Sequence, residues 1–136
     1  MKKIISLLAL LFLTTVVFAQ SFTLKTADKN PCKIILENDF IIIEETLLGG
    51  YINRITIPKT KFTAIKTMVS FEEGCKSVIN NPPYMETTDS IYIVEEQNNP
   101  QVIGYLSSMA VYQQKIIMGI WLNKKDIDAI AKKLKL

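Results

Sequence analysis

Three pairs of adjacent glutamates are the residues of this sequence best suited to catalysis. They are Glu44-Glu45, Glu72-Glu73 and Glu95-Glu96, and the 136-residue chain contains no histidine. The absence of histidine excludes a Ser-His-Asp or Cys-His triad and removes the commonest general base. Two carboxylates can hydrolyse a glycoside when they stand about 5–10 Å apart across a cleft. Since neighbours on a strand point to opposite faces, only members of different pairs could converge.

Other catalytic signatures are missing from the sequence. It contains no P-loop, no GxGxxG and no zinc-ligand spacing. Each glutamate pair falls at the end of a predicted strand, where solvated charge also protects sheet edges from aggregation. We therefore expect a protein with no catalytic residues, cofactor or metal. A hydrolase that uses converging glutamates is kept as an alternative.

Residues 1–19 have the three parts of a secretory signal peptide. Two lysines precede an apolar run over residues 4–18, and Val17 and Ala19 fit the small residues of a cleavage site. The run is shorter than the roughly 20 residues of a spanning helix, and no cysteine follows it closely, as a lipoprotein would require. We expect cleavage after Ala19 and a secreted or periplasmic protein without a membrane span in its mature form.

Cleavage would leave 117 residues, an ordinary size for one domain. It would remove two lysines and reduce the net charge from +3 to +1, with 14 basic and 13 acidic side chains remaining. A nearly neutral chain does not indicate nucleic-acid binding. We divide it into an N-terminal arm or edge strand at 20–31 and a single β-rich domain at 32–136, with an unknown protein or cell-envelope component as partner.

Cys32 and Cys75 are the two cysteines of the chain. An even number in an exported protein is typical of a disulfide, because the compartment is oxidising. A metal pair or a catalytic thiol would need a CxxC spacing or a histidine, and the sequence has neither. The sequence therefore predicts a Cys32–Cys75 disulfide, worth about 4 kcal/mol in the chain-entropy model.

Turn residues between apolar, β-branched runs predict about seven antiparallel strands. The turns lie at Asn38-Asp39, at Gly49-Gly50 and within 97–100. The strands that flank them are 32–36, 40–43, 51–58, 91–94 and 102–106, with another at 115–122. Residues 62–73 fit both a strand and a helix, and the β-branched content favours a strand.

The polar segment 74–90 is predicted to be a long connecting loop, and functional residues are often found on such loops. A modest basic cluster of Arg54, Lys59, Lys61 and Lys66 surrounds the turn at Pro58. Together these two features give the residues that we expect in a contact surface: Asn80, Asn81, Pro82, Pro83, Tyr84, Arg54, Lys59 and Lys61. The aromatic side chains that could line a sugar- or peptide-binding face are Tyr84, Tyr92, Tyr105, Tyr112 and Trp121, although isolated aromatics on strands more often pack in a core.

The last element is predicted to be a helix over 124–135. Asn123 is a good N-cap residue, and Asp126 at the third helical position resembles a capping box. An apolar stripe of Ile127, Ile130 and Leu134 follows the helical period, while the lysines face outward. We expect the stripe to cover the domain's own sheets rather than to reach a membrane.

Strands followed by one terminal helix resemble a bacterial pleckstrin-homology-like domain over about residues 32–136. The segment "ITIPKTKFTAI", Ile55 to Ile65, is similar to a strand end, polar turn and new strand in bacterial members. Two features depart from the family: Trp121 precedes the helix instead of lying in it, and the loop Glu37-Asn38-Asp39 is not basic. The resemblance thus implies a binding scaffold but not recognition of a lipid headgroup.

We therefore expect a mainly β (α+β) fold: two packed antiparallel sheets, or a partly open barrel, closed by the C-terminal helix. The expected function is that of an exported non-enzymatic binding or structural module. The second alternative is a carrier of a small apolar ligand. Its cavity would be lined by residues such as Ile91, Ile93, Ile116 and Met118.

Overall fold

The computed structural model describes residues 19–80, 85–87, 90–107 and 119–136. The predicted signal peptide therefore lies outside the described residues, apart from Ala19. So do 81–84, which form half of the predicted contact surface, and Tyr112, Ile116 and Met118.

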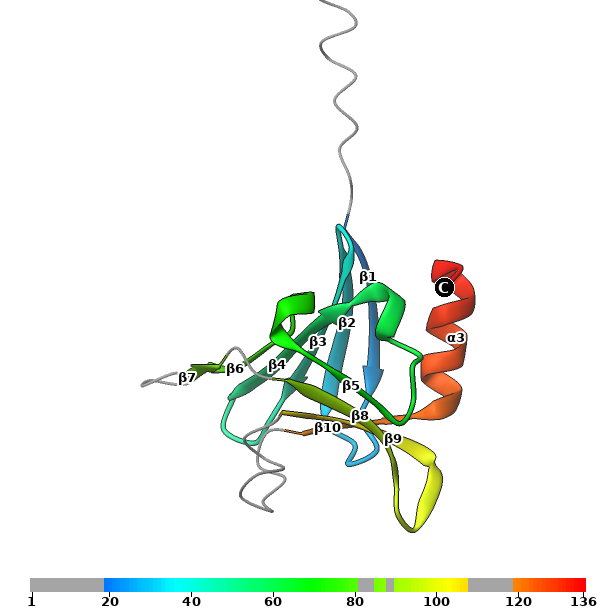
Figure 1. The fold of residues 1–136 in the computed structure, drawn as a ribbon. Coiled ribbons are helices and arrows are strands. Elements are labelled where there is room, and N and C mark those ends of the chain that lie inside the picture. Colours follow the sequence, from blue (N-terminus) through cyan, green and yellow to red (C-terminus); the bar gives the residue numbers. More distant parts are fainter. Residues whose placement is uncertain (1–18, 81–84, 88–89, 108–118) are drawn as a thin grey trace, which may run out of the picture.

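The described residues form two antiparallel sheets and one C-terminal α-helix (Figure 1). The larger sheet has the order β1-β2-β3-β4-β6-β7 and the smaller one β10-β9-β8-β5. The strands of the larger sheet are β1 (Gln20–Lys25), β2 (Pro31–Glu37), β3 (Phe40–Thr46), β4 (Ile52–Pro58), β6 (Lys76–Asn80) and β7 (Met85–Thr87). Those of the smaller sheet are β5 (Thr67–Val69), β8 (Ile91–Glu96), β9 (Asn99–Ser107) and β10 (Ile120–Asn123). The mainly β fold is confirmed, with more strands than the seven predicted.

The core lies between the inner faces of the two sheets. Alternate residues of each strand point inward, and on β2, β3 and β4 these include Ile34, Ile43 and Ile55, which are neighbours in register and have no exposed surface. Ile93 and Tyr105 hold the matching positions on β8 and β9. All five belong to one buried cluster that spans both sheets. The period-two pattern of the sequence is therefore what folds the domain.

Phe62 and Tyr105 connect the segment between β4 and β5 to this core. Phe62 follows the short 3₁₀ helix η1 (Lys59–Lys61) and is fully buried. The Tyr105 hydroxyl donates a 2.7 Å hydrogen bond to the Phe62 carbonyl, and the two rings stack with centroids 6.0 Å apart. Burial raises the pKa of Tyr105, so the hydroxyl keeps its proton and its bond.

Two of the predicted turns are confirmed by backbone geometry. Asn38 joins β2 to β3 with a φ of 54°. Gly49 and Gly50 join β3 to β4 with φ values of 86° and 82°, a region that suits glycine. Between β8 and β9 the turn is shorter than predicted, because Asn99 and Pro100 already belong to β9.

The ambiguous segment 62–73 is a strand over only three residues, Thr67–Val69, and the 3₁₀ helix η2 (Phe71–Glu73) follows it. The predicted loop over 74–90 is wrong for much of its length. Residues 76–80 are strand β6, which pairs with β4, and 85–87 are strand β7. The backbone groups along β4 need partners, and β6 supplies them although three of its five side chains are polar.

Helix α3 (Lys124–Leu134) covers β9, β10 and the side of β1 (Figure 1). Ile127 and Ile130 are buried and Leu134 packs partly against the core, which confirms the predicted stripe. On the exposed side, Lys133 Nζ lies 5.6 Å from the centre of the Phe22 ring of β1. None of the helices in the described ranges is long and apolar enough to cross a membrane.

The predicted capping box is not formed. Asn123 takes the N-cap position with an extended backbone, but its side chain makes no cap hydrogen bond.

The predicted disulfide is also corrected, because Cys32 and Cys75 are both buried free thiols. Cys75 directly precedes β6, on the line across the sheet that passes through Ile57, Ile41 and Leu36. Cys32 lies three strands away and four residues further along β2. Three steps between neighbouring strands amount to about 14 Å, and four residues along a strand amount to about 13 Å. Both offsets separate the Cα atoms of the two cysteines. A disulfide needs Cα atoms within about 7 Å.

Candidate functional site

The predicted basic cluster is divided among three ion pairs. Arg54 on β4 pairs with Glu44 at 3.2 Å, and Lys59 pairs with Asp39 at 3.3 Å. Lys66 pairs with Glu95 at 3.3 Å. Asn80, the described end of the predicted contact loop, is the last residue of β6. The predicted surface residues therefore do not form one site in the described part of the chain.

The members of the three glutamate pairs lie in different surroundings. Glu44 and Glu45 point to opposite faces of β3, as strand alternation requires. Glu45 is only 3% exposed and accepts a 2.9 Å hydrogen bond from Asn30 Nδ2. Glu72 and Glu73 are exposed on η2. The last member, Glu96, lines a hollow at the end of the smaller sheet.

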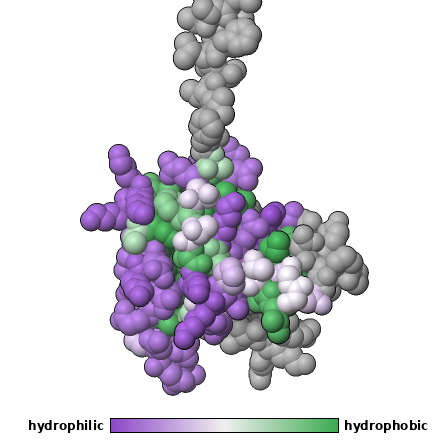
Figure 2. Space-filling model, turned by 180° about the vertical axis from the view of Figure 1, so that it is seen from behind, coloured by the Kyte–Doolittle hydropathy of each residue, from purple (hydrophilic) through white to green (hydrophobic). Residues whose placement is uncertain are grey.

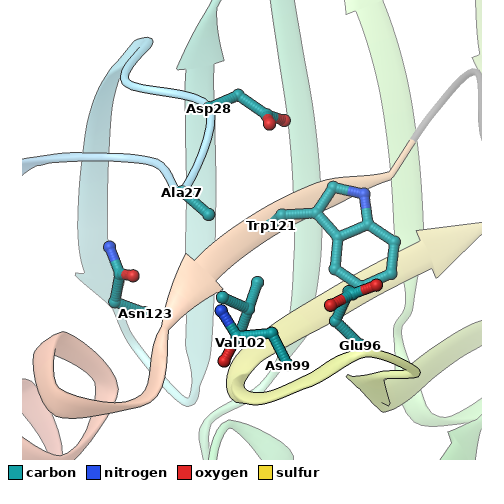
Figure 3. Close-up of a pocket in the computed structure, with 7 residues that line it drawn as sticks. All are labelled: Ala27, Asp28, Glu96, Asn99, Val102, Trp121 and Asn123. Carbon is teal, nitrogen blue, oxygen red and sulfur yellow. The ribbon is translucent and has the colours of Figure 1, made fainter.

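This hollow, which we call the Trp121 hollow, has a volume of about 470 Å³ (Figure 3). It lies between the β1–β2 turn, the β8–β9 hairpin and strand β10. Its lining residues are Ala27, Asp28, Glu96, Asn99, Val102, Trp121 and Asn123. Two smaller hollows, of about 130 and 200 Å³, lie between β1 and α3 and on the outer side of the larger sheet.

A set of backbone hydrogen bonds holds the β1–β2 turn at the edge of the Trp121 hollow. The Ala27 N–H donates to the Trp121 carbonyl of β10 at 2.8 Å. Within the turn, the Thr26 N–H donates to the Asn30 carbonyl at 2.9 Å, and the Asn30 N–H donates to Thr26 Oγ1 at 3.1 Å. The Asn30 side chain also donates a hydrogen bond to the carboxylate of the buried Glu45. Asp28 is thus carried by a fixed turn rather than by a free loop.

Gly104 leaves room for the Trp121 ring to lie against strand β9. The two residues face each other in the β9–β10 ladder. A Cβ atom on Gly104 would lie 2.6 Å from Trp121 Cζ3 and 2.8 Å from both Cε3 and Cη2. The six-membered ring of the indole therefore lies directly over the glycine backbone, where a side chain would displace it. One face of the ring is supported by the sheet, and the half-buried ring leaves aromatic surface open to the hollow (Figure 3).

The polar side chains around Trp121 are mostly uncommitted. Across the described part of the chain, no hydrogen bond or ion pair engages the side chains of Asp28, Glu96 or Asn123. Asn99 Oδ1 accepts the Gln101 N–H at 3.2 Å, which leaves the Asn99 amide N–H groups to face the hollow. The hollow thus presents two carboxylates, two amides and an aromatic surface, and none of the described residues that line it is basic.

In the parts of the chain that the structure describes, no group of three or more Cys, Asp or Glu side chains could hold a metal ion. Figure 2 shows the face behind that of Figure 1, where apolar side chains appear as small patches among hydrophilic ones. Large apolar patches typically mark protein or membrane contacts.

Among the described aromatic residues that were predicted to line a binding face (Tyr92, Tyr105 and Trp121), Trp121 alone lines the hollow. Tyr105 is part of the core and Tyr92 is half-buried on β8, while Tyr84 and Tyr112 fall outside the described residues. Asp28, Glu96 and Asn99 were missed as a group because they come from two different turns. One signal was available: a glycine inside a strand often marks a close approach by another group, and Gly104 has this position in β9.

No protein-family model matches the chain, no curated protein matches it, and no solved structure matches it.

Proposed function

We propose that the domain is an exported, non-enzymatic binding module and that the Trp121 hollow is its binding surface. The observation that carries the proposal is an aromatic surface surrounded by uncommitted polar side chains on fixed elements. Ligand sites typically combine apolar surface with a few polar groups that fix orientation. The two sheets closed by a terminal helix support a pleckstrin-homology-like scaffold, a class used mostly for binding, and the expected signal peptide supports export.

Asn123 supports the choice of this surface. An asparagine at the N-cap usually stabilises its helix by about 1 kcal/mol through a side-chain hydrogen bond. Asn123 has the N-cap position without that bond and lines the hollow instead. Helix α3 therefore lacks the stabilisation that a cap hydrogen bond from Asn123 would give. Departures of this kind from the most stable arrangement are expected at functional sites.

The carrier alternative is less well supported. Ile91 and Ile93, two of the four residues expected to line an apolar cavity, have no exposed surface and pack in the central cluster. An external site agrees better with this packing than an internal cavity does.

A carboxylate-based hydrolase is the second candidate, because Asp28 and Glu96 line the same hollow from different turns. A glycosidase needs two such carboxylates. If the domain were a hydrolase, the single variants Asp28→Asn and Glu96→Gln would each abolish turnover of a glycoside that the wild type cleaves. A binding module would show no turnover in any form.

Trp121 makes the main proposal testable by fluorescence, because it is the single tryptophan of the chain. Cell-envelope material, separated into polysaccharide, peptide and lipid fractions, is added to the folded protein. We expect one fraction to shift the Trp121 emission and to protect it from quenching by acrylamide. The double variant Asp28→Asn/Glu96→Gln should lose this response.

The matched control is Glu72→Gln/Glu73→Gln, which removes the same charge from exposed positions on η2. It should respond as the wild type does. A fraction that binds the protein without changing Trp121 emission, and equally in both double variants, would show that binding occurs elsewhere.

A further inference from the structure

We infer that the ligand of the Trp121 hollow is an uncharged sugar unit, stacked on the indole and hydrogen-bonded through its hydroxyls to Asp28, Glu96 and Asn99. This inference rests on the proposed function, since it names the ligand class of the same site. It follows from the balance of donors and acceptors in the lining, from the single aromatic platform and from the rigidity of the surrounding elements.

The lining offers donors and acceptors together. Asp28 and Glu96 can only accept when ionised, whereas the Asn99 amide adds two N–H donors beside an oxygen that already accepts from Gln101. A cationic ligand would satisfy the carboxylates and leave the amide donors idle. An anionic ligand would face two carboxylates with no basic side chain to offset them. A hydroxyl group both donates and accepts, so a neutral polyol satisfies the whole lining.

Trp121 offers one platform rather than a cage. Quaternary ammonium groups are usually held by several aromatic rings, and among the described residues that line the hollow Trp121 is the one aromatic. Because Gly104 supports the ring from the sheet side, a ligand can stack only on the remaining surface. The axial C–H groups of a sugar ring suit this arrangement, since the π face of an aromatic ring is negative.

Size and rigidity agree with a small glycan segment. A volume of about 470 Å³ falls within the usual range of small-ligand sites, about 300–1,000 Å³. Asp28 is held by the braced β1–β2 turn, and Trp121 by the β9–β10 ladder. Elements that are ordered before binding lose little entropy when the ligand arrives, which favours affinity from a few contacts.

The test is a titration of ¹⁵N-labelled protein, followed through the single indole N–H resonance and the Gly104 amide. The probes are tetrasaccharides of glucose, galactose, mannose and N-acetylglucosamine, with tetra-glucosamine as a cationic match and tetra-galacturonate as an anionic match. We expect at least one neutral probe to move both resonances below about 10 mM. Its affinity should stay constant between roughly 0.01 and 1 M salt, since no charge is paired.

Variants locate the binding. Trp121→Ala and Glu96→Gln should each weaken binding of the neutral probe by at least about tenfold. The control Glu72→Gln should leave it unchanged, and retained amide dispersion shows that each variant is folded.

The possible outcomes separate this inference from the proposed function. If glucosamine or galacturonate oligomers move the indole resonance and no neutral sugar does, the hollow binds ligands but the sugar assignment is wrong. If no sugar moves it while a peptide or lipid fraction does, the sugar assignment again fails alone. If an envelope fraction retains the protein and nothing moves the indole resonance, both proposals fail.

Discussion

The two faces of the β9–β10 ladder are built from alternate residues of the same strands, yet they differ in burial and in hydrogen bonding. On the inner face, Ile120 and Tyr105 are register partners with no exposed surface, and the Tyr105 hydroxyl is bonded to the Phe62 carbonyl. On the outer face, the next pair is Trp121 and Gly104, which leaves aromatic surface open beside uncommitted polar groups.

A small sheet can thus have one face that stabilises the fold and another face that stays open. Strand alternation assigns neighbouring residues to opposite faces, so one face can be closed by packing while the other stays available. Substitutions on the inner face should change the free energy of unfolding. Substitutions on the outer face should mainly change the environment of Trp121 and ligand binding.

The largest effect is expected from Phe62→Ala, which removes a fully buried ring and the stacking on Tyr105. Such cavities typically cost about 3–5 kcal/mol. Urea unfolding followed by circular dichroism measures this cost. Phe71→Ala is the matched control, because Phe71 is 57% exposed and its loss should cost less than about 1 kcal/mol. Equal costs for the two variants would contradict the assignment of the core.

Alkaline pH should weaken the buried core through its two thiols, Cys32 in β2 and Cys75 next to β6 of the larger sheet. Burial raises the pKa of Cys32 to about 12, and the charges of Glu45 and Glu44 add to the rise. Burial also raises the pKa of Cys75 to about 12, with Glu73 adding to it. The ordinary value is 9.0, so the unfolded chain loses these protons first. The stabilisation is complete below pH 9 and is lost as the pH rises toward 12.

Each thiol should lower the free energy of unfolding by roughly 1.4 kcal/mol per pH unit in that window. The measurement compares urea unfolding between pH 8 and pH 10.5 for the wild type and for Cys32→Ala/Cys75→Ala, since lysines and tyrosines titrate in both. The wild type should show the steeper loss, and thiol titration in urea should find two free groups. Identical slopes, or no free thiols, would show that the cysteines are not buried as free thiols.

A smaller effect on stability is expected from Gly104→Ala on the outer face. The added Cβ would meet the indole at 2.6 Å, but the half-buried ring can turn away toward solvent. We expect a cost of about 1 kcal/mol, together with a red shift of Trp121 emission and stronger quenching by acrylamide. Unchanged emission would mean that Gly104 does not position the ring.

The sequence predicted those parts of the fold in which one element carries its own signal. The Asn38 and Gly49-Gly50 turns, the inward row of β4 and the stripe of α3 were all visible in local patterns. The pattern failed for β6, in which only Val78 and Ile79 are apolar, because this strand is stabilised by pairing with β4. It failed for Cys32 and Cys75 because cysteine counting ignores strand register, which separates them across the larger sheet.

The site was less predictable because it depends on contacts between distant segments. The hydrogen bond from the Ala27 N–H to the Trp121 carbonyl joins residues 94 positions apart and brings Asp28 to the hollow. No local period encodes such a contact. Asn123 takes the predicted N-cap position, but its side chain lines the hollow and forms no cap hydrogen bond, which the local pattern could not reveal.

The most direct test of the account is the calorimetric titration of Trp121→Ala with the envelope fraction or oligosaccharide that the wild type binds, performed on protein whose urea unfolding has been measured. We predict that the heat of binding disappears while the free energy of unfolding falls by no more than about 1–2 kcal/mol, as suits a partly buried side chain. A stable variant that binds with the affinity of the wild type would contradict the central claim.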